Sequence, residues 1–396
     1  MKNLSEHCNL NLLGGVSCLA FSKQTHPKTM KTLRNLLIFT LLSSSVALAG
    51  VIGKSEKGAP EIKAINVISF AEDGVLLIGD GQSGQVVAVE TGDTKPVTGK
   101  FADTKNFALE IAGRLGVGAS DVEIIDLAVN PASGKLYIAV RKQDDKTYLI
   151  VRLAPGGEIE HFGLSDVTFA AVPLPEGVNN ITDVVWIDNR LLASARKNEE
   201  FASKIFSVDG PLDHGSGGSV YSAETFHIQH GRWETKAPMS VMIPYTENGK
   251  HYIVGAFACT PVVRYPIDDV QPGAKIKGES VIEFGSGNRP LDMFTYERGG
   301  KPSVLTNAKR FHHERAPYGP SPHVAFRFDE KLLGTDKVNE KGQHRMKDAA
   351  ALGDVIELVE PFHGVVQMDK LNDSTAIALR EGKDEGQLDL VMIALP

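Results

Sequence analysis

Three aspartates and one asparagine occupy the same place in a pattern that recurs along this sequence. Asn66, Asp126, Asp183 and Asp292 each stand near the start of a short apolar run. Carboxylate and amide oxygens of this kind are ligands for hard divalent cations such as Ca²⁺. Carboxylates that converge raise one another's pKa values unless a counter-charge lies nearby. If the fold brings these positions together, a divalent metal or a set of basic side chains has to balance them.

Basic side chains stand at a second recurring place, where the next apolar run ends, and the longer loops add further basic and aromatic residues. The run ends carry Arg141, Arg196, Lys309 and Arg380, and the loops carry His230, Arg232, Trp233, Arg289 and His363. These side chains could neutralise the aspartates through ion pairs, or they could bind an acidic or planar ligand. The residues alone leave the metal, the ion pairs and the ligand site open.

The elements that must position these residues are short strands. The clearest unit is Ile124–Asn130, a turn ending at Gly134, and then Lys135–Arg141. Runs rich in Val, Ile, Leu and aromatic residues, bounded by Gly, Asp, Asn and Pro, are typical of strands. The first strands of six such units are predicted at Ile65–Phe70, Ile124–Asn130, Ile181–Asp188, Met239–Tyr245, Leu291–Tyr296 and Gly364–Leu371.

The spacing of the units predicts an all-β, six-bladed β-propeller. Units begin roughly 50 to 75 residues apart, near the length of a four-stranded blade with its loops. A β-sandwich is the alternative, and a seventh blade would have to lie between Lys309 and Leu358. The last unit shows three strands, so Pro60–Ala64 is predicted to add the fourth and close the ring. Helical spacing over Lys105–Leu115, before Gly116, predicts a short surface helix.

This architecture predicts one site at one face. The first strand of each blade lines the central channel and begins where the second strand ends, so the aspartates and the basic residues should share that face. The opposite face has minimal turns such as Ser133-Gly134, whereas the long loops fall on the predicted face. Loops held by a rigid scaffold commonly carry binding residues.

The first 49 residues are predicted to be a leader and signal peptide. Met30–Arg34 is a basic start, Leu36–Leu42 is apolar, and Ala47–Ala49 ends in small residues, the order typical of a secretory signal. Met30 is an alternative true start. The apolar run is shorter than the roughly 20 residues that span a bilayer. The sequence therefore predicts a periplasmic or secreted protein, cleaved near Ala49, with one domain over 50–396 and no transmembrane segment.

Charge and cysteine content narrow the class of protein. The chain of 396 residues has a formal net charge of −7, and the leader holds five basic residues and one acidic residue, which leaves −11 on the rest. Without a basic run, a nucleic-acid partner is not expected. Cys259 is the one cysteine after the leader, so no intramolecular disulfide can form. The sequence has no Gly-rich phosphate loop, haem-attachment motif or Gly-x-Ser-x-Gly elbow.

The unit Leu127–Tyr137, with Asn130-Pro131 and Ser133-Gly134 at its turn, resembles those of secreted six- or seven-bladed propellers. This class includes gluconolactonase/regucalcin-like, NHL-repeat and YVTN-type proteins. Members similar to gluconolactonase hold a divalent metal in the central channel through Glu, Asn and Asp ligands. The resemblance therefore implies Ca²⁺ or another divalent metal on Asn66, Asp126, Asp183 and Asp292, although no glutamate stands near the start of the first unit.

Three functions follow from these residues. The leading hypothesis is a propeller that binds a small-molecule or protein ligand on its loop-rich face without catalysis. The first alternative is a metal-dependent hydrolase of lactones, with a metal-bound water as nucleophile. The second is a quinone-cofactor dehydrogenase, in which Arg and His residues would hold the acidic groups of the cofactor.

Overall fold

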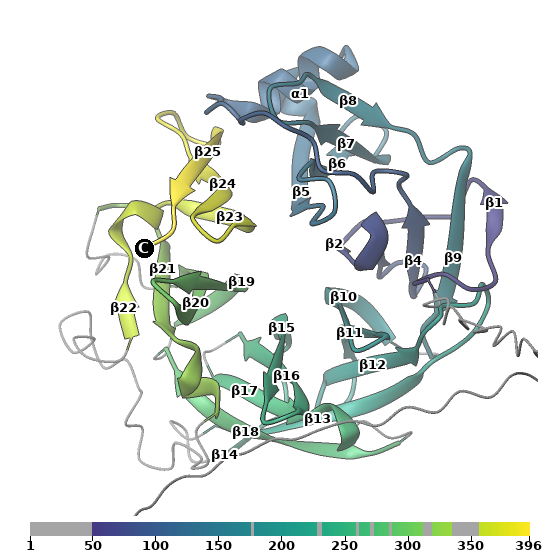
Figure 1. Ribbon diagram of the computed structural model, residues 1–396, viewed down its shortest axis with the longest axis vertical. Helices are drawn as coiled ribbons and strands as arrows, with labels where there is room; N and C mark the ends of the chain where they lie inside the picture. The colour runs from purple at the N-terminus through teal and green to yellow at the C-terminus, as the bar shows by residue number, and fades with distance from the viewer. Residues whose placement is uncertain are drawn as a thin grey trace, which may run out of the picture. The chain divides into compact units, whose positions relative to one another are not determined.

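The computed structural model describes residues 50–175, 178–227, 232–258, 261–269, 273–284, 287–311, 319–334 and 356–396. These residues belong to one compact unit, Leu48–Pro396. The unit is built from antiparallel blades of three to five strands, which together form a propeller (Figure 1). The prediction of a six-bladed all-β fold is confirmed.

Each of the first three blades has four main strands. Blade one contains β2 (Val67–Phe70), β3 (Val75–Asp80), β4 (Gln85–Glu90) and β9 (Val167–Pro173), with β1 (Glu56–Gly58) on its edge. Blade two contains β5 (Val122–Val129), β6 (Leu136–Lys142), β7 (Tyr148–Leu153) and β8 (Ile159–Phe162). Blade three contains β10 (Val178–Ile187), β11 (Arg190–Lys197), β12 (Ser203–Asp209) and β13 (Ser219–His227), which also pairs with β14 (Arg232–Glu234).

The remaining blades follow in chain order. Blade four contains β15 (Met239–Glu247), β16 (Lys250–Phe257), β17 (Pro261–Pro266) and β18 (Lys275–Glu283). Blade five contains β19 (Asn288–Arg298), β20 (Lys301–Arg310), β21 (His323–Asp329) and β22 (Ile356–Leu358). Blade six contains β23 (Val365–Asn372), β24 (Thr375–Glu381) and β25 (Leu388–Ala394). Parallel pairing of β13 with β18 joins blades three and four into one nine-stranded sheet.

Apolar cores lie between the blades and give their order around the ring. One core is shared by blades one and two, and others are shared by blades one and three, three and four, four and five, five and six, and two and six. The order around the ring is therefore two, one, three, four, five, six, as Figure 1 also shows. Because each blade is covered on both faces, middle strands such as β3 are buried along their whole length.

Blade two is an insertion within blade one. The chain leaves blade one after β4, builds β5 to β8, and returns to add β9 beside β4. The predicted closure by Pro60–Ala64 is wrong, because Ala64 instead donates its backbone N–H to Asp80 of blade one. The edge of blade six is met by the segment that leads into blade two, where Thr104 bridges to Leu390. Within the described residues of 309–358, β21 and β22 belong to blade five, so no seventh blade is seen there.

The predicted surface helix is confirmed as α1 (Phe107–Leu115). Phe107, Ile111 and Ala112 are buried on the face that packs on blade two. Gly116 ends the helix with φ of 70°, a left-handed conformation in which a side chain would be strained. In the described part of the chain, no helix has the length and apolar content to cross a bilayer.

Candidate functional site

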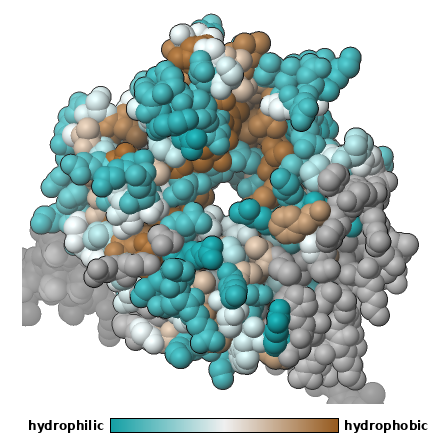
Figure 2. All heavy atoms as spheres, turned by 180° about the vertical axis from the view of Figure 1, so that it is seen from behind, coloured by the Kyte–Doolittle hydropathy of each residue, from teal (hydrophilic) through white to brown (hydrophobic). Residues whose placement is uncertain are grey.

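A cavity of about 760 Å³ runs along the centre of the ring. Its walls are the first strands of the six blades: β2, β5, β10, β15, β19 and β23. Figure 2 shows the opening, with polar and apolar residues around it. Asn66 and Arg289 line the end where these strands begin, which we call the upper face, and Pro131 lines the other end. The N–H of Asn66 is donated to the carbonyl oxygen of Gly79 near the end of β3, so in blade one the first strand begins where the second strand ends.

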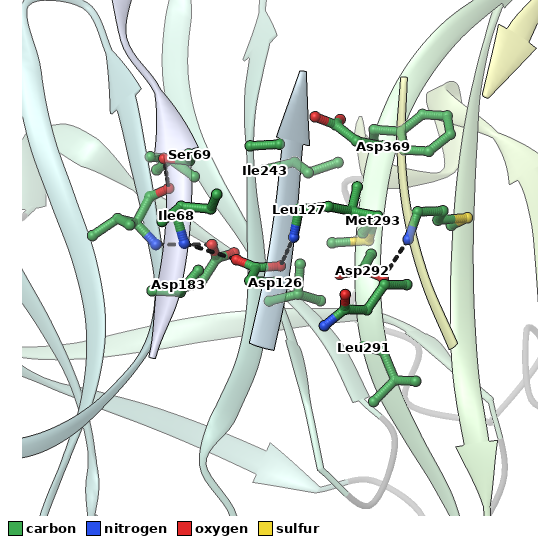
Figure 3. Close-up of a pocket in the computed structure, with 18 of the residues that line it drawn as sticks. Ile68, Ser69, Asp126, Leu127, Asp183, Ile243, Leu291, Asp292, Met293 and Asp369 are labelled. Atoms are coloured by element: carbon green, nitrogen blue, oxygen red, sulfur yellow. Dashed lines mark hydrogen bonds between the residues drawn. The ribbon is translucent and has the colours of Figure 1, made fainter. Parts of the chain in front are cut away.

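Four aspartates fasten the inner strands of neighbouring blades to one another, and we call them the carboxylate clamps. Asp126 Oδ2 accepts the N–H of Ile68 at 2.7 Å, across the boundary between blades two and one. Asp183 joins blade three to four through the N–H of Met242 at 2.5 Å. Two more clamps join Asp292 to Met368 at 2.9 Å and Asp369 to Val129 at 2.7 Å. Figure 3 shows these side chains in the cavity.

The inner strands direct the clamps across the blade boundaries by local irregularity. The pairing of β5 with β6 shifts between Ile124 and Asp126, and that of β10 with β11 shifts between Ile181 and Asp183. Such bulges turn a side chain away from its regular direction. The second oxygen of Asp126 accepts the N–H of Leu127 at 2.9 Å. Each carboxylate thus satisfies an amide of a neighbouring first strand, which is the edge strand of its blade and has no strand beyond it to accept that N–H.

The clamps hold protons more strongly than ordinary aspartates. Burial raises the pKa of Asp126 to about 8, and the charges of Asp183 and Asp369 add to the rise. Burial likewise raises the pKa of Asp183 to about 7 and that of Asp369 to about 6, and it raises the pKa of Asp292 well above its ordinary value. The side chains keep partial exposure only to the narrow cavity, so bulk water does not solvate their charged forms.

These hydrogen bonds bear on the predicted metal ligands. Within the described ranges, no three His, Cys, Asp or Glu side chains are grouped closely enough to hold a metal ion. Asn66 is exposed and accepts the N–H of Gly81 at 2.7 Å. A metal on Asn66, Asp126, Asp183 and Asp292 stays a prediction, and Asp126, Asp183 and Asp292 already have a structural role.

The sequence left open that basic side chains neutralise the aspartates through ion pairs, and among the described residues the structure shows no such pairing for Arg141 or Arg196. Arg141 pairs with Glu123 at 3.2 Å, and the exposed Arg196 makes no ion pair in the part of the chain described. Pairing of either arginine with Asp126 or Asp183 is therefore wrong. Backbone N–H groups bind the oxygens of Asp126 and Asp183 instead, and burial favours the neutral, protonated form of each side chain.

Four of the predicted binding residues do come together, on the upper face where blades five and six meet. Arg289 of β19 lies directly opposite Lys309 of β20, and Lys309 lies opposite His323 of β21. Gly364, next to His363, donates its N–H to the carbonyl oxygen of His323. The set also includes Arg380 of β24, and we call Arg289, Lys309, His323, His363 and Arg380 the basic cluster.

The side chains of the cluster share one space because of the strand registers. Directly opposed residues in antiparallel strands point to the same side of a sheet, so Arg289, Lys309 and His323 share one face of blade five. That face is turned to blade six, since His323 Nδ1 lies 2.9 Å from Oε1 of Glu381 in β24. Arg380 lies opposite Val365, whose side chain is buried against blade five. Both blades therefore direct cations into their shared boundary.

Charge in the cluster is only partly compensated. Within the described residues, the side chains of Arg289 and Lys309 make no ion pair, and Arg380 reaches only the carbonyl oxygen of Pro361, at 3.5 Å. Burial lowers the pKa of His323, opposed by the charge of Glu381 and assisted by Lys309 and His363. Three fixed cations are therefore accompanied by two carboxylates, Glu381 and, opposite Arg380 in β25, Asp389, with two histidines beside them.

The other predicted residues lie elsewhere. Arg232 and Trp233 are on β14, which pairs with the outer strand β13, and neither lines the cavity. Trp233 is 40% exposed and contacts Phe226 and Lys277. His230 lies outside the described residues. The structure therefore does not bring the Arg232–Trp233 pair to the channel mouth.

Three residues that matter here were missed by sequence reasoning: Asp369, His323 and Glu381. Asp369 lies two residues beyond Gln367, where the alignment of first strands placed the sixth polar position. His323 opens a third strand, and third strands begin at the same face where second strands end. The start of a third strand, here His323 at the start of β21, is therefore the signal in the sequence that points to this residue.

Comparisons with known proteins extend no further than the fold. No protein-family model and no curated protein matches the chain. Among solved structures, it is similar to the PQQ-bound aldose sugar dehydrogenase from Streptomyces coelicolor, with 10% identity, a TM-score of 0.35, and coverage of 86% of this chain and 99% of that one. It is also similar to the catalytic domain of a family 62 α-L-arabinofuranosidase from Coprinopsis cinerea, with 8% identity, a TM-score of 0.32, and coverage of 68% and 90%. Such low identities assign no activity, and what the chain shows is a β-propeller.

Proposed function

We propose that this propeller binds an acidic small molecule on its upper face, at the basic cluster between blades five and six. The observation that supports the proposal is the convergence of Arg289, Lys309 and Arg380 from three strands onto one boundary. Guanidinium and ammonium groups form strong, charge-assisted hydrogen bonds with carboxylates and phosphates. Arg289 also lines the cavity, so a ligand held there would extend toward the channel.

The surroundings favour a ligand over a purely structural role. Arg289 and Lys309 are both exposed, and they lie side by side without a carboxylate partner in the described residues. Like charges at this separation repel each other, and an anion would relieve that repulsion.

The hairpin of β19 and β20 supplies the experiment and its control. The double variant Arg289→Ala/Lys309→Ala removes the pair at the upper end, and Arg298→Ala/Lys301→Ala removes the opposed pair at the lower end of the same hairpin. We expect the first double variant to weaken binding of citrate and sulfate, measured by calorimetry, by at least about 100-fold, because each of the two lost charged contacts costs roughly 1.5–3 kcal/mol. The second should bind as the unaltered protein does. Equal affinity in all three proteins, or no binding by the unaltered protein, would refute the proposal.

A quinone cofactor with several carboxylates is a second candidate for the acidic ligand. The three fixed cations of the basic cluster favour it, because each could hold one carboxylate. Adding pyrroloquinoline quinone to the purified protein should then shift the absorbance spectrum of the quinone, and Arg289→Ala/Lys309→Ala should abolish the shift. An unchanged spectrum would remove this candidate and leave the anion site in place.

We also propose that the protein acts in the periplasm or outside the cell, on the strength of the signal-like order in residues 30–49. Expression of the full chain followed by fractionation and N-terminal sequencing tests this. A mature N-terminus near Gly50 is expected, and retention of residues 1–49 in the cytoplasm would contradict it.

A further inference from the structure

The pairing of His323 with Glu381 gives the basic cluster a property beyond charge. His323 Nδ1 lies 2.9 Å from Oε1 of Glu381. An ionised carboxylate can only accept a hydrogen bond, so Nδ1 carries a proton and the tautomer is fixed. The other ring nitrogen, Nε2, has no hydrogen-bond partner in the described part of the chain. It is therefore the atom of His323 that remains for a ligand.

His323 is also held rigidly. Its side chain is largely buried, with the residue only 9% exposed, and its backbone N–H is donated to Ser321 Oγ at 3.0 Å. The charged or titratable groups around the ring are Lys309 on β20, Glu381 and Arg380 on β24, and His363 before β23. Three of these four are cationic or can become so, which makes the boundary favourable for an anion beside Nε2.

We propose that His323 is a direct ligand-binding residue of this site and that an oxyanion binds there together with one proton. The proton lies between Nε2 and a ligand oxygen. Either protonated His323 donates Nε2–H to a fully ionised oxyanion, or neutral His323 accepts an O–H from a ligand that brings the proton. The ligand class is thus a phosphate-like or carboxylate oxyanion, and this inference rests on the proposed anion site.

Sulfate separates the two sources of the proton, since it stays a dianion across the relevant range of pH. Any proton taken up with sulfate must therefore go to the protein. Calorimetry at about pH 5.5 and about pH 8, in two buffers of different ionisation enthalpy, measures that uptake on either side of the ordinary histidine pKa. We expect proton uptake that approaches one where the pH lies between the pKa values of His323 in the free and in the bound protein, and affinity that falls by up to about tenfold for each pH unit over that range.

Two variants test whether His323 is the group responsible. His323→Gln should still bind sulfate, more weakly and without proton uptake, because Arg289, Lys309 and Arg380 remain. His251→Gln removes a histidine on β16, at the other end of the propeller blades, and should behave as the unaltered protein. Unfolding curves of both variants show whether the fold is intact.

The outcomes distinguish this inference from the proposed function. Sulfate binding that is lost in Arg289→Ala/Lys309→Ala but involves no proton uptake would overturn the role of His323 and leave the anion site standing. Proton uptake that persists in His323→Gln would also overturn it. Failure of the unaltered protein to bind sulfate or citrate at either pH would overturn both.

Discussion

The carboxylate clamps and the basic cluster are both groups of like-charged side chains, yet the protein treats them differently. The clamps recur at several blade boundaries, and their oxygens accept backbone N–H groups from the next blade. The cluster occurs at one boundary, and Arg289 and Lys309 have no ion-pair partner among the described residues. Carboxylates that recur between blades and accept backbone hydrogen bonds are best explained by a role in holding the fold. Cations that gather at one boundary without an ion-pair partner are best explained by the binding of an anion.

The first prediction tests whether a carboxylate clamp contributes to stability and not to binding. Asp183→Ala should lower the free energy of unfolding by about 1–3 kcal/mol, because the buried N–H of Met242 loses its acceptor. Urea unfolding measures the change, and sulfate affinity should stay the same. Asp166→Ala is the control, since that side chain is 75% exposed. A clamp variant that loses sulfate binding without losing stability would reverse the assignment.

The second prediction concerns pH. The folded pKa of Asp126 is about 8, well above the roughly 3.9 of an unfolded aspartate. Between these two pKa values the folded protein holds a proton that the unfolded chain releases. The contribution of Asp126 to the free energy of unfolding is therefore fully present below about pH 4 and is lost as the pH rises toward about 8. The slope is at most about 1.4 kcal/mol per pH unit for one proton.

Asp126→Asn sharpens this test, because asparagine keeps a carbonyl oxygen for one amide but cannot ionise. We expect its unfolding free energy to fall less steeply between about pH 4 and about pH 8 than that of the unaltered protein. Urea unfolding at several pH values provides the comparison. Parallel curves for the two proteins would show that Asp126 does not titrate in this range.

A third prediction reverses the first. Arg289→Ala/Lys309→Ala should change the free energy of unfolding by no more than about 0.5 kcal/mol, as is usual for surface substitutions, although it abolishes most sulfate binding. Removing two exposed side chains that make no ion pair within the described residues should change the free energy of unfolding very little. Marked destabilisation would mean that the pair belongs to the structure, as the clamps do.

The smallest expected effect is that of metal removal. Chelator treatment, or added Ca²⁺, should leave the melting temperature unchanged, because the carboxylate oxygens of the channel already accept hydrogen bonds from backbone N–H groups. A channel metal present at about 100 times its Kd would instead add about 2.7 kcal/mol. A rise in melting temperature with Ca²⁺, together with metal found by elemental analysis, would restore the predicted ligand set.

Local patterns in the sequence predict the strands and the helix well, but they do not predict contacts between segments that are far apart in the sequence. Apolar runs bounded by turn residues predicted all six inner strands, and the spacing before Gly116 predicted α1. The pairing of β4 with β9 joins Gln85 to Pro173, and no repeat in the sequence indicates that another blade lies between them. The same limit hid the partners of Asp126 and Asp183, which are backbone amides and have no side-chain signature.

For the candidate site, the sequence indicated the face and most of the basic residues. Lys309 and Arg380 could be assigned from the ends of second strands, and Arg289 and His363 from the long loops. It could not show that Arg141 turns to Glu123 or that Trp233 lies on an outer hairpin, because those depend on rotamers and on how far β13 extends. It also could not show that His323 meets Glu381, since they are brought together only by the packing of two blades.

The insertion of blade two has a consequence for synthesis on the ribosome. When β4 emerges, its outer edge, which carries Val86, Val87 and Val89, has no partner until Val167–Pro173 follows. At translation rates of roughly 5–20 residues per second, that delay is on the order of 4–15 s. An open apolar edge is a template for pairing with other chains. The nascent protein therefore passes through an interval of exposure to aggregation, and that interval begins before its first blade is complete.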